Sequence, residues 1–402
     1  MRLLFLLTQD LESPGGAGRY FPLARGLARR GHQVSIGALH SSYDSLKEKR
    51  FEREGVAVHY VAPMHVRKQG DLKTYYPAYR LLPLMAWATA GLARLALQGG
   101  YDLIHIGKPH PMNGVAGLLA RRLRGRRVWL DVDDYEAATN RFSGGWQRRL
   151  VSSFEDGLPL RVEGVTTHTQ FLRRRLLSLG VPEGHITYLP NGFDPERFSP
   201  PPAERVAALR AELGLEGCKV AAFIGSLSLS SHPVDLLVEA FEQVAAEEPA
   251  ARLLLVGGGE DMPRIRARVE GAGLAGRVIF RGRVPFSEAP LYYRLADLTL
   301  DPVYDDDVAR SRQPLKLFES LACGVPFVSA DVGDRRLLLG EPPAGLLARP
   351  GDPRALAEAV LALFRRPEAA AELARRGLER VQAYRWERIV ETLEAQYLRS
   401  LG

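Results

Sequence analysis

The sequence predicts an α/β protein built from two doubly wound, Rossmann-like domains that face each other across a cleft. Short apolar segments alternate with longer helical patterns along the chain, which is typical of parallel sheets covered by helices. The alternation restarts in the second half, after a linker rich in proline. A chain of 402 residues is long enough for two domains that each bury a core.

The short apolar segments bounded by turn residues are predicted to be strands. In the first half they are Leu3–Leu7, Val34–Ala38, Val56–Val61, Leu103–Ile106, Val128–Val132 and Val165–His168. In the second half they are Val220–Ile224, Leu253–Val256, Val278–Phe280, Leu298–Asp301 and Phe327–Ser329. The linker joins Asn191 and Gly192 to a group of prolines. We therefore assign residues 1–188 to the first domain and residues 189–385 to the second, with a helix over 386–402 that is polar on one side.

Composition excludes several classes of protein. An apolar fraction of 46% and a charged fraction of 25% are those of a soluble globular chain. Cys218 and Cys323 are far apart in sequence, which predicts buried thiols in a reducing compartment and no disulfide or zinc framework. The first apolar run is short and leads into Gln9 and Asp10, so it is interpreted as a strand and not as a signal peptide.

A net charge of +7 calls for an anionic partner or for none. The arginine clusters at 121–127 and 173–175 are interpreted as solvated helix ends, with an anionic membrane surface or a lipid phosphate as the alternative. Neither cluster is interleaved with aromatic residues, which argues against nucleic acid. The apolar stretch from Leu81 to Leu97 is interrupted by Pro83, Gly91 and Arg94 and falls short of about 20 residues. It is expected to be a core or surface-lying helix of the first domain.

The segment from Pro314 to Ser329 carries the strongest functional signal. It predicts a short helix that Pro314 opens and Gly324 closes, followed by a buried strand. Lys316 and Glu319 are three residues apart and lie on one face near the helix N-terminus. Such an end suits a phosphate, and a carboxylate one turn deeper can accept both hydroxyls of a ribose. The pair fits a nucleoside diphosphate; the alternative is an ordinary helix with a surface Lys–Glu pair.

Three other segments accompany this helix in a recognisable order. A glycine loop at 13–18 follows the first strand, Pro190-Asn191-Gly192 lies within 189–200, and a strand runs into a second glycine loop at 253–260. Together with the Glu319 helix, this order resembles glycosyltransferase family 4, the retaining two-domain sugar transferases of GT-B fold. The resemblance covers nearly the whole chain. It implies that residues 1–188 form the acceptor-side domain, onto which the helix 386–402 crosses back, and that residues 189–385 bind the nucleotide sugar.

The resemblance also implies an activity and its setting. The expected reaction moves a hexose-type sugar from a nucleoside diphosphate to a hydroxyl of a sugar, a lipid-linked or a small-molecule acceptor, as in polysaccharide, glycan or glycolipid synthesis. No cofactor or metal is expected, because positive protein groups neutralise the diphosphate. The spelling Asp131-Val132-Asp133 keeps a metal site as a minor alternative. The expected location is cytoplasmic, with peripheral contact at the inner membrane face as a further option.

Roles pass to individual residues through the resemblance. Glu319 is expected to hold the ribose, and Lys316, with the amides of the turn at Pro314 and Leu315, the phosphates. Asp133 stands where many relatives carry a histidine beside the donor sugar, and it is assigned to the sugar or to the proton of the acceptor; a helix-capping turn is the alternative. Catalysis is thus assigned to Lys316, Asp133 and Glu319. The expected substrate-binding residues are Gly15, Gly16, Ser226, His232, Gly258, Arg283, Val284, Pro314, Leu315, Lys316 and Glu319.

The chain departs from the family pattern at charged positions. Ser311 stands where the first of two glutamates is usual, and Ser226 stands in place of an arginine that binds the diphosphate. His232 or Ser231 takes the place of a lysine. Something positive must replace the missing groups. Lys316 is the best-placed candidate, with Arg310, Arg312 and a protonated His232 as helpers.

Two other functions compete with glycosyl transfer. A Rossmann dehydrogenase needs Gly-x-Gly-x-x-Gly after the first strand and an acid after the second. Here the loop reads Gly15-Gly16-Ala17-Gly18 and the second strand runs into His40, so this NAD-dependent class ranks low. The other is a non-catalytic nucleotide-sugar-binding protein that kept the fold after losing the charged groups that Ser226 and Ser311 replace.

Overall fold

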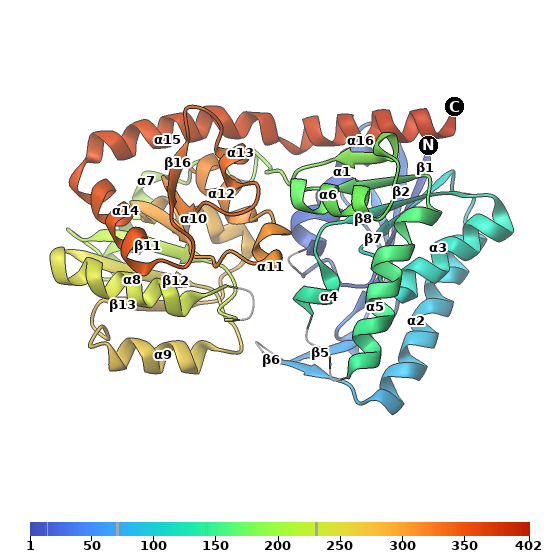
Figure 1. The fold of residues 1–402 in the computed structure, drawn as a ribbon, viewed down its shortest axis with the longest axis horizontal. Coiled ribbons are helices and arrows are strands. Elements are labelled where there is room, and N and C mark those ends of the chain that lie inside the picture. Colours follow the sequence, from blue (N-terminus) through green and yellow to red (C-terminus); the bar gives the residue numbers. More distant parts are fainter. Residues whose placement is uncertain (14, 70–71, 141, 143, 230–231) are drawn as a thin grey trace. The chain divides into compact units, whose positions relative to one another are not determined.

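The computed structural model describes residues 1–13, 15–69, 72–140, 142, 144–229 and 232–402 (Figure 1). The chain forms two compact units. Unit 1 comprises Met1–Asn191 and Trp386–Gly402, and unit 2 comprises Gly192–Arg385. The first boundary therefore falls after Asn191, three residues beyond the predicted boundary after residue 188.

Unit 1 contains an eight-stranded sheet in the order β10-β9-β8-β7-β1-β2-β4-β3. Its pairings are parallel, apart from the antiparallel pair of β3 with β4. The chain winds outward from β1 through β2 to β4, and then restarts on the other side of β1 with β7, β8, β9 and β10. The strands are β1 (Arg2–Leu7), β2 (Gln33–His40), β3 (Arg50–Arg53), β4 (Val56–Pro63), β7 (Leu103–Gly107), β8 (Arg127–Val132), β9 (Gly164–Thr167) and β10 (Ile186–Tyr188).

Helices cover both faces of this sheet because each buries an apolar stripe against it. One core joins the sheet to α1 (Phe21–Arg29) and α16 (Trp386–Leu401), which lie side by side in Figure 1. The opposite core joins it to α2 (Ala78–Gln98), α3 (Pro111–Arg124) and α6 (Gln170–Ser178). The last helix was predicted correctly, and it packs in unit 1 as the resemblance implied. Two further helices and a hairpin lie outside this layering: α4 (Glu136–Thr139), α5 (Gly145–Gly157), and β5 (Val66–Gln69) with β6 (Leu72–Tyr75).

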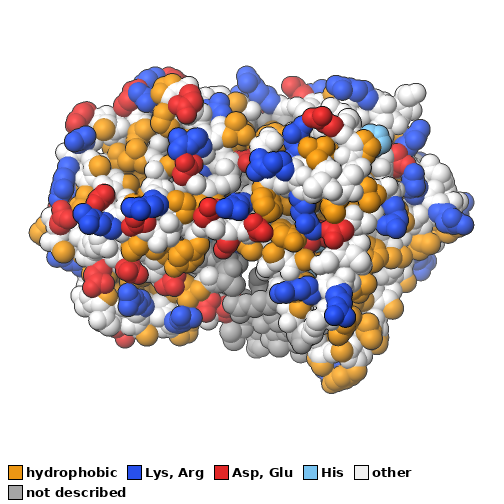
Figure 2. Space-filling view, viewed as in Figure 1, with side chains coloured by type: hydrophobic (Ala, Val, Ile, Leu, Met, Phe, Trp, Pro, Cys, Tyr) orange, Lys and Arg blue, Asp and Glu red, His pale blue; other side chains and the backbone are white. Residues whose placement is uncertain are grey.

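Helix α2 is longer than the sequence suggested. It has 21 residues and is long and apolar enough, by length and composition, to cross a membrane, with 22% of its apolar window buried. The stretch was expected to fall short of a membrane span; α2 reaches that length because Pro83 lies inside the helix without ending it. Tyr79, Leu82 and Trp87 are half or more exposed. Hydrophobic side chains gather over the start of α2 at the lower edge of Figure 2.

Unit 2 contains a six-stranded, fully parallel sheet in the order β13-β12-β11-β14-β15-β16. Here the chain winds outward from β11 to β13 and then restarts beside β11 with β14. The strands are β11 (Lys219–Ile224), β12 (Ala251–Val256), β13 (Val278–Gly282), β14 (Leu298–Asp301), β15 (Phe327–Ala330) and β16 (Gly345–Ala348). One face packs on α7 (Ala203–Glu212), α10 (Ala289–Leu295), α12 (Leu315–Ala322) and α13 (Arg335–Leu339), and the other on α8 (Val234–Glu247), α9 (Met262–Gly271), α14 (Pro353–Arg365) and α15 (Pro367–Val381). A short helix, α11 (Asp307–Arg310), precedes α12.

Both units are thus doubly wound, and each has a switch point where the strand order reverses. Ligands of such sheets bind at the carboxyl ends of the strands, next to this switch point. It lies between β1 and β7 in unit 1 and between β11 and β14 in unit 2. These two places are where functional side chains are expected.

Candidate functional site

Lys316 lies at the switch point of unit 2, on the first turn of α12. Its ammonium Nζ donates a hydrogen bond to Oδ1 of Asp301, 3.1 Å away at the end of β14. The same Nζ lies 4.1 Å from the centre of the Phe223 ring on β11. A Cβ atom added to Gly225, just after β11, would lie 3.3 Å from Nζ, so the glycine leaves room for the ammonium. Lys316 therefore sits where the strand ends of β11 and β14 meet.

Asp301 also binds Arg335, the first residue of α13. Nε and Nη2 of Arg335 lie 3.1 and 2.8 Å from Oδ2 of Asp301. Ser329 on β15 donates its hydroxyl to the backbone oxygen of Asp301 at 2.8 Å. These three side chains and that of Lys316 are buried. Neither Asp301 nor Arg335 was singled out from the sequence, although Asp301 ends a predicted strand.

Burial and neighbouring charges shift the pKa values of Asp301 and Lys316 in opposite directions. Burial alone would raise the pKa of Asp301, but Lys316 and Arg335 outweigh it and hold that pKa well below its usual range. Burial lowers the pKa of Lys316, and Asp301 opposes that change. Burial, followed by the charge of Lys316, lowers the pKa of His232 well below its usual value. The expectation that a protonated His232 assists with the diphosphate is therefore wrong, because this ring is neutral near pH 7.

Glu319 lies one turn further along α12 and is half-buried. Its Oε2 accepts a hydrogen bond of 2.7 Å from the hydroxyl of Tyr293 on α10. Burial raises the pKa of Glu319, while the Tyr293 bond and the Arg197 charge lower it. A surface pair between Lys316 and Glu319 is excluded, because Lys316 is buried against Asp301. Tyr293 was missed from the sequence because a tyrosine in a helix gives no sign of what it faces.

Pro314 and Leu315 open α12, with Pro314 at the N-cap. Proline has no N–H, so the first free amides of this helix belong to Leu315 and Lys316. Both Pro314 and Leu315 are half-buried. Ser311, where a glutamate is usual, is buried and donates its hydroxyl to the backbone oxygen of Val308 at 2.9 Å. It therefore closes the short helix α11 and offers no charge.

The glycine loops of unit 2 pack against each other. Gly257 has φ +141°, and a Cβ there would lie 1.8 Å from the backbone oxygen of Gly225. The amide of Leu227 donates to the backbone oxygen of Gly258 at 3.0 Å. Loop packing alone therefore accounts for Gly257, and the substrate role of Gly258 stays a prediction. Ser226, between these contacts, is exposed.

Arg283 and Val284, expected to pair with the base through their backbone, follow β13. Arg283 is exposed, and Val284 is half-buried and packs against the core of unit 2. Their pairing with the nucleotide base stays a prediction, because recognition through the backbone does not depend on which side chains are present.

At the switch point of unit 1, Arg19, which follows the glycine loop, forms hydrogen bonds with β8 and with the Pro-Asn-Gly segment. Its Nε and Nη2 each lie 2.7 Å from a carboxylate oxygen of Asp131. Its Nη1 donates to Oδ1 of Asn191 at 2.9 Å and to the backbone oxygen of Leu189 at 3.2 Å. Thr166 donates to Asp131 at 2.5 Å. Both carboxylate oxygens of Asp131 therefore accept hydrogen bonds from buried side chains. This disfavours Asp131 as one of the two ligands of an Asp-x-Asp metal site.

Asp133, two residues on, belongs to a different group. The ammonium of Lys108, just after β7, lies 3.3 Å from Asp133, 2.7 Å from Asp134 and 2.8 Å from Glu136. Lys108 has φ +70°, an unfavourable backbone conformation for a residue with a side chain, and such strain gathers at functional sites. The three carboxylates are close enough together to hold a cation, and the ammonium lies among them.

Burial raises the pKa of Asp133 to about 7, with Lys108 opposing and the neighbouring carboxylates adding to the rise. Its Oδ1 is buried and accepts no hydrogen bond from the described residues. A carboxyl group with these properties can take or give a proton near neutral pH. The role of Asp133 toward the sugar or the acceptor stays a prediction, and its raised pKa is compatible with that role. Lys108 was missed, although its place two residues after the predicted strand Leu103–Ile106 is a usable signal.

Gly15 and Gly16 begin the turn of helix that follows β1. A Cβ at Gly16 would lie 2.1 Å from the backbone oxygen of Asp10, and one at Gly15 would lie 2.5 Å from the amide end of Gln9. The chain's own backbone thus requires glycine at position 16. Closeness to a substrate stays a prediction for both.

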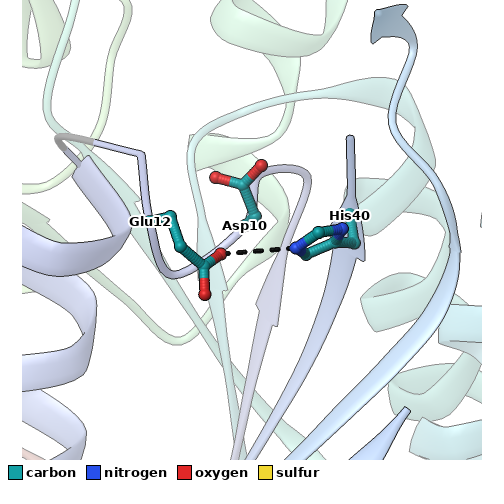
Figure 3. A group of neighbouring side chains, drawn as sticks. All are labelled: Asp10, Glu12 and His40. Atoms are coloured by element: carbon teal, nitrogen blue, oxygen red, sulfur yellow. Dashed lines mark ion pairs between the residues drawn. The ribbon is translucent and has the colours of Figure 1, made fainter. Parts of the chain in front are cut away.

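A second acidic group lies at the carboxyl ends of β1 and β2. Figure 3 shows the carboxylate of Glu12 directed toward the ring of His40, with Asp10 nearby. Oε2 of Glu12 lies 3.5 Å from Nε2 of His40 and accepts a hydrogen bond of 3.2 Å from Tyr60. Asp10 is buried and Glu12 is exposed. These side chains were not predicted as site residues, because they are spread over 30 positions of the sequence.

Unit 1 also holds a mostly apolar cavity of about 90 Å³ between α2, α3 and α5. His110 lines the cavity, and its Nε2 lies 3.2 Å from Oε2 of Glu136. The cavity therefore borders the Lys108 group, which consists of Lys108, Asp133, Asp134 and Glu136. Asn140, on the same wall, donates to Glu136 at 2.6 Å. The lining residues are His65, Tyr76, Leu81, Met85, His110, Pro111, Met112, Asn140, Phe142, Trp146, Gln147, Leu150 and Val151.

Comparisons with known proteins agree with both units. Residues 15–192 match the family model described as "Glycosyl transferase 4-like domain", and residues 218–366 match "Glycosyl transferases group 1". The D-inositol 3-phosphate glycosyltransferase of Nocardia farcinica is 32% identical over 93% of this chain and 82% of its own. Sucrose-phosphate synthase from Thermosynechococcus elongatus, 21% identical, superposes with a TM-score of 0.78 over 99% of both chains. HepE from Anabaena, in complex with UDP-glucose, is 20% identical with a TM-score of 0.75 over the full length of both.

The two structural relatives share the GT-B fold, which confirms the predicted fold class. The dehydrogenase alternative is wrong, because the chain matches glycosyltransferase family models and a glycosyltransferase that is 32% identical over 93% of its length. The non-catalytic alternative loses its support as well, because the matching relatives are enzymes. The chain belongs to glycosyltransferase family 4 and is a glycosyltransferase.

Proposed function

We propose that this protein is a retaining glycosyltransferase that moves a hexose-type sugar from a nucleoside diphosphate to an acceptor hydroxyl. The observation that carries the proposal is the placing of Lys316 and Glu319 on the first turns of α12, at the switch point of unit 2. A cation and two free amides at Leu315 and Lys316 suit a diphosphate, and Glu319 suits a ribose. The relative HepE carries UDP-glucose in its complex, which supports a donor of this class.

The side chains divide the work of such a reaction. Lys316 and the helix amides stabilise the negative charge that develops on the departing diphosphate. The acceptor hydroxyl attacks from the face that the diphosphate leaves, and the departing phosphate oxygen takes its proton. Asp133 orients the sugar or the acceptor hydroxyl and exchanges a proton near pH 7. Protein cations carry the neutralising charge, which supports transfer without a metal.

The donor is tested by incubating the protein with a panel of nucleotide sugars without acceptor. An active transferase slowly releases nucleoside diphosphate from its own donor. Release from at least one member, with the anomeric configuration kept in the product once an acceptor is found, supports the proposal. A folded protein that cleaves none of the panel would count against it.

For the acceptor, we propose a hydroxyl compound with an apolar part. The support is the apolar cavity beside the Lys108 group: its lining includes Leu81, Met85 and Met112, and its polar edge is His110. With the donor known, matched glycosides that carry a methyl or an octyl group test this. The octyl glycoside is expected to show a KM about tenfold lower or better. Leu81→Gln should remove the difference, while the exposed Leu160→Gln on unit 1 should keep it.

Peripheral contact with a membrane from the cytoplasmic side is proposed as well. Its support is the exposed apolar surface at Tyr79, Leu82 and Trp87 on α2. The arginine clusters give less support, since Arg121 pairs with Glu163 and Arg173 with Glu183. Sedimentation with anionic vesicles, compared between the wild type and Leu82→Gln/Trp87→Gln, tests this contact. Equal sedimentation of both proteins would remove α2 from the contact.

A further inference from the structure

We propose that Asp301, itself fixed by Arg335, is a positioning residue that keeps Lys316 charged and aimed at the donor diphosphate. The proposal rests on the function proposed above and names how this chain replaces the cations missing at Ser226 and His232. Asp301 needs no contact with the donor for this role, because it acts through Lys316.

The geometry fixes the ammonium from several sides. Oδ1 of Asp301 accepts a hydrogen bond of 3.1 Å from the ammonium, the centre of the Phe223 ring lies 4.1 Å from Nζ, and Gly225 leaves room for the ammonium. A lysine held by one hydrogen bond keeps two donors for a ligand. An unpaired lysine on four rotatable bonds would instead lose side-chain entropy when it binds the diphosphate. Fixing Nζ beforehand lowers that cost.

The charges around Lys316 also favour its protonated form. A buried ammonium without a counter-ion tends to lose its proton. If Asp301 paired with Lys316 alone, the two charges would cancel, and no net positive charge would remain to attract an anion. Arg335 supplies the second cation, so the group of Asp301, Lys316 and Arg335 carries a net charge of +1. This is the sign that a diphosphate needs.

Arg335 is a support for Asp301 and not a second ligand for the donor. Its Nε and Nη2 bind Asp301, and Nε also lies 3.0 Å from Oγ of Ser329. Its Nη1 donates to the backbone oxygen of Val332 at 3.1 Å. Arg335 is 3% exposed. Its donors are therefore turned into the protein, while Lys316 lies at the strand ends.

The groups that face Lys316 come from four elements. They are Asp301 of β14, Arg335 of α13, Glu319 of its own helix and His232 of the loop before α8. His232 is neutral, so Asp301 and Glu319 are the groups that favour the charged lysine. Replacing Asp301 by asparagine removes the nearer of these charges and leaves Arg335 to repel the ammonium. The lysine then loses its proton at lower pH than in the wild type.

The test compares Asp301→Asn with the matched control Asp331→Asn. Asp331 also pairs with an arginine of α13, Arg336, but on the exposed surface. Donor hydrolysis is measured from pH 6.5 to pH 9. For Asp301→Asn, the loss relative to wild type is expected to be at least about tenfold larger at pH 9 than at pH 6.5, because one pH unit past a pKa changes the charged fraction about tenfold. Asp331→Asn should follow the wild type, and Lys316→Arg, which cannot lose its proton, should remove the pH dependence when combined with Asp301→Asn.

A second readout does not depend on catalysis. The sequence has seven lysines, so the side-chain signal of Lys316 can be followed by NMR in lysine-labelled protein and assigned with Lys316→Arg. A Lys316 signal that titrates at lower pH in Asp301→Asn supports the proposal even if no donor has been found. An unchanged titration, or an equal loss of hydrolysis at both pH values in a folded variant, overturns it. If the wild type hydrolyses no donor but the Lys316 titration is shifted in Asp301→Asn, the result contradicts the proposed function and leaves the positioning role of Asp301 supported.

Discussion

The hydroxyl of Tyr293 donates a hydrogen bond of 2.7 Å to the carboxylate of Glu319. It fixes the one acidic side chain that the proposed function assigns to the ribose, and it comes from α10, a helix that no sequence motif marked. Because a carboxylate held in this way keeps lone pairs for two hydroxyls, Glu319 is ready for a ligand before the ligand arrives.

Replacing Glu319 by glutamine should raise the dissociation constant of the matching nucleoside diphosphate about tenfold or more, because hydrogen bonds to a charged group contribute roughly 1.5–3 kcal/mol each. Tyr293→Phe should weaken binding by a smaller factor, since it frees Glu319 without removing it. Calorimetry gives both values. The exposed Tyr304→Phe serves as the control, and unchanged affinity in folded Glu319→Gln would take this residue out of the site.

Removing divalent metals should leave the rate of donor hydrolysis within about twofold, because the proposed function assigns to Lys316, held by Asp301 and Arg335, the positive charge that a metal would supply elsewhere. The measurement adds a chelator to purified protein and then restores magnesium or manganese. A rate that falls with chelator and returns with metal would point to Asp133, Asp134 and Glu136 as ligands, with Lys108 displaced.

Acceptor transfer should depend on the protonation of Asp133. Its pKa is raised to about 7, so its charged form dominates above that pH and disappears below it. If the carboxylate is the working form, transfer falls as the pH drops through about 7, and Asp133→Asn loses this acid limb along with most of its rate. Donor hydrolysis without acceptor is the internal control. An acid limb that survives in Asp133→Asn would assign it to another group.

The buried pair of Arg19 and Asp131 should matter for folding. Arg19→Met leaves the Asp131 carboxylate buried without its partner and is expected to destabilise unit 1 by about 3–5 kcal/mol. The exposed pair of Arg121 with Glu163 offers the control, because Arg121→Met should cost less than about 1 kcal/mol. Chemical denaturation followed by circular dichroism compares the two variants. Similar midpoints would mean that the Arg19 network contributes little.

Much of the fold could be read from the sequence because buried parallel strands are continuous apolar runs. Predicted strands such as Leu103–Ile106 and Leu298–Asp301 agree with the structure to within two residues at each end. The strands that were missed are short or lie at sheet edges: Arg50–Arg53 is polar, and Ile186–Tyr188 has three residues. Such segments carry too little apolar pattern to stand out from a loop.

The proposed site could be predicted to the extent that one motif carried it. Lys316 and Glu319 lie on one helix, so their spacing in the sequence was enough to single them out. Their partners Asp301, Arg335 and Tyr293 come from other elements, and tertiary packing alone brings them together. The error over His232 has the same origin, because its pKa depends on burial and on Lys316, neither of which is visible along the chain.

The most direct test of the account is the release of nucleoside diphosphate by Lys316→Met and the wild type, measured with the donor that the wild type cleaves best. On the proposed function, Lys316 faces the charge that develops on the leaving diphosphate, so the variant should turn over about a hundredfold more slowly or worse while remaining folded. A Lys316→Met protein that keeps more than about half of the wild-type rate, a loss far smaller than such a group should cause, would contradict the assignment of the leaving-group cation to Lys316.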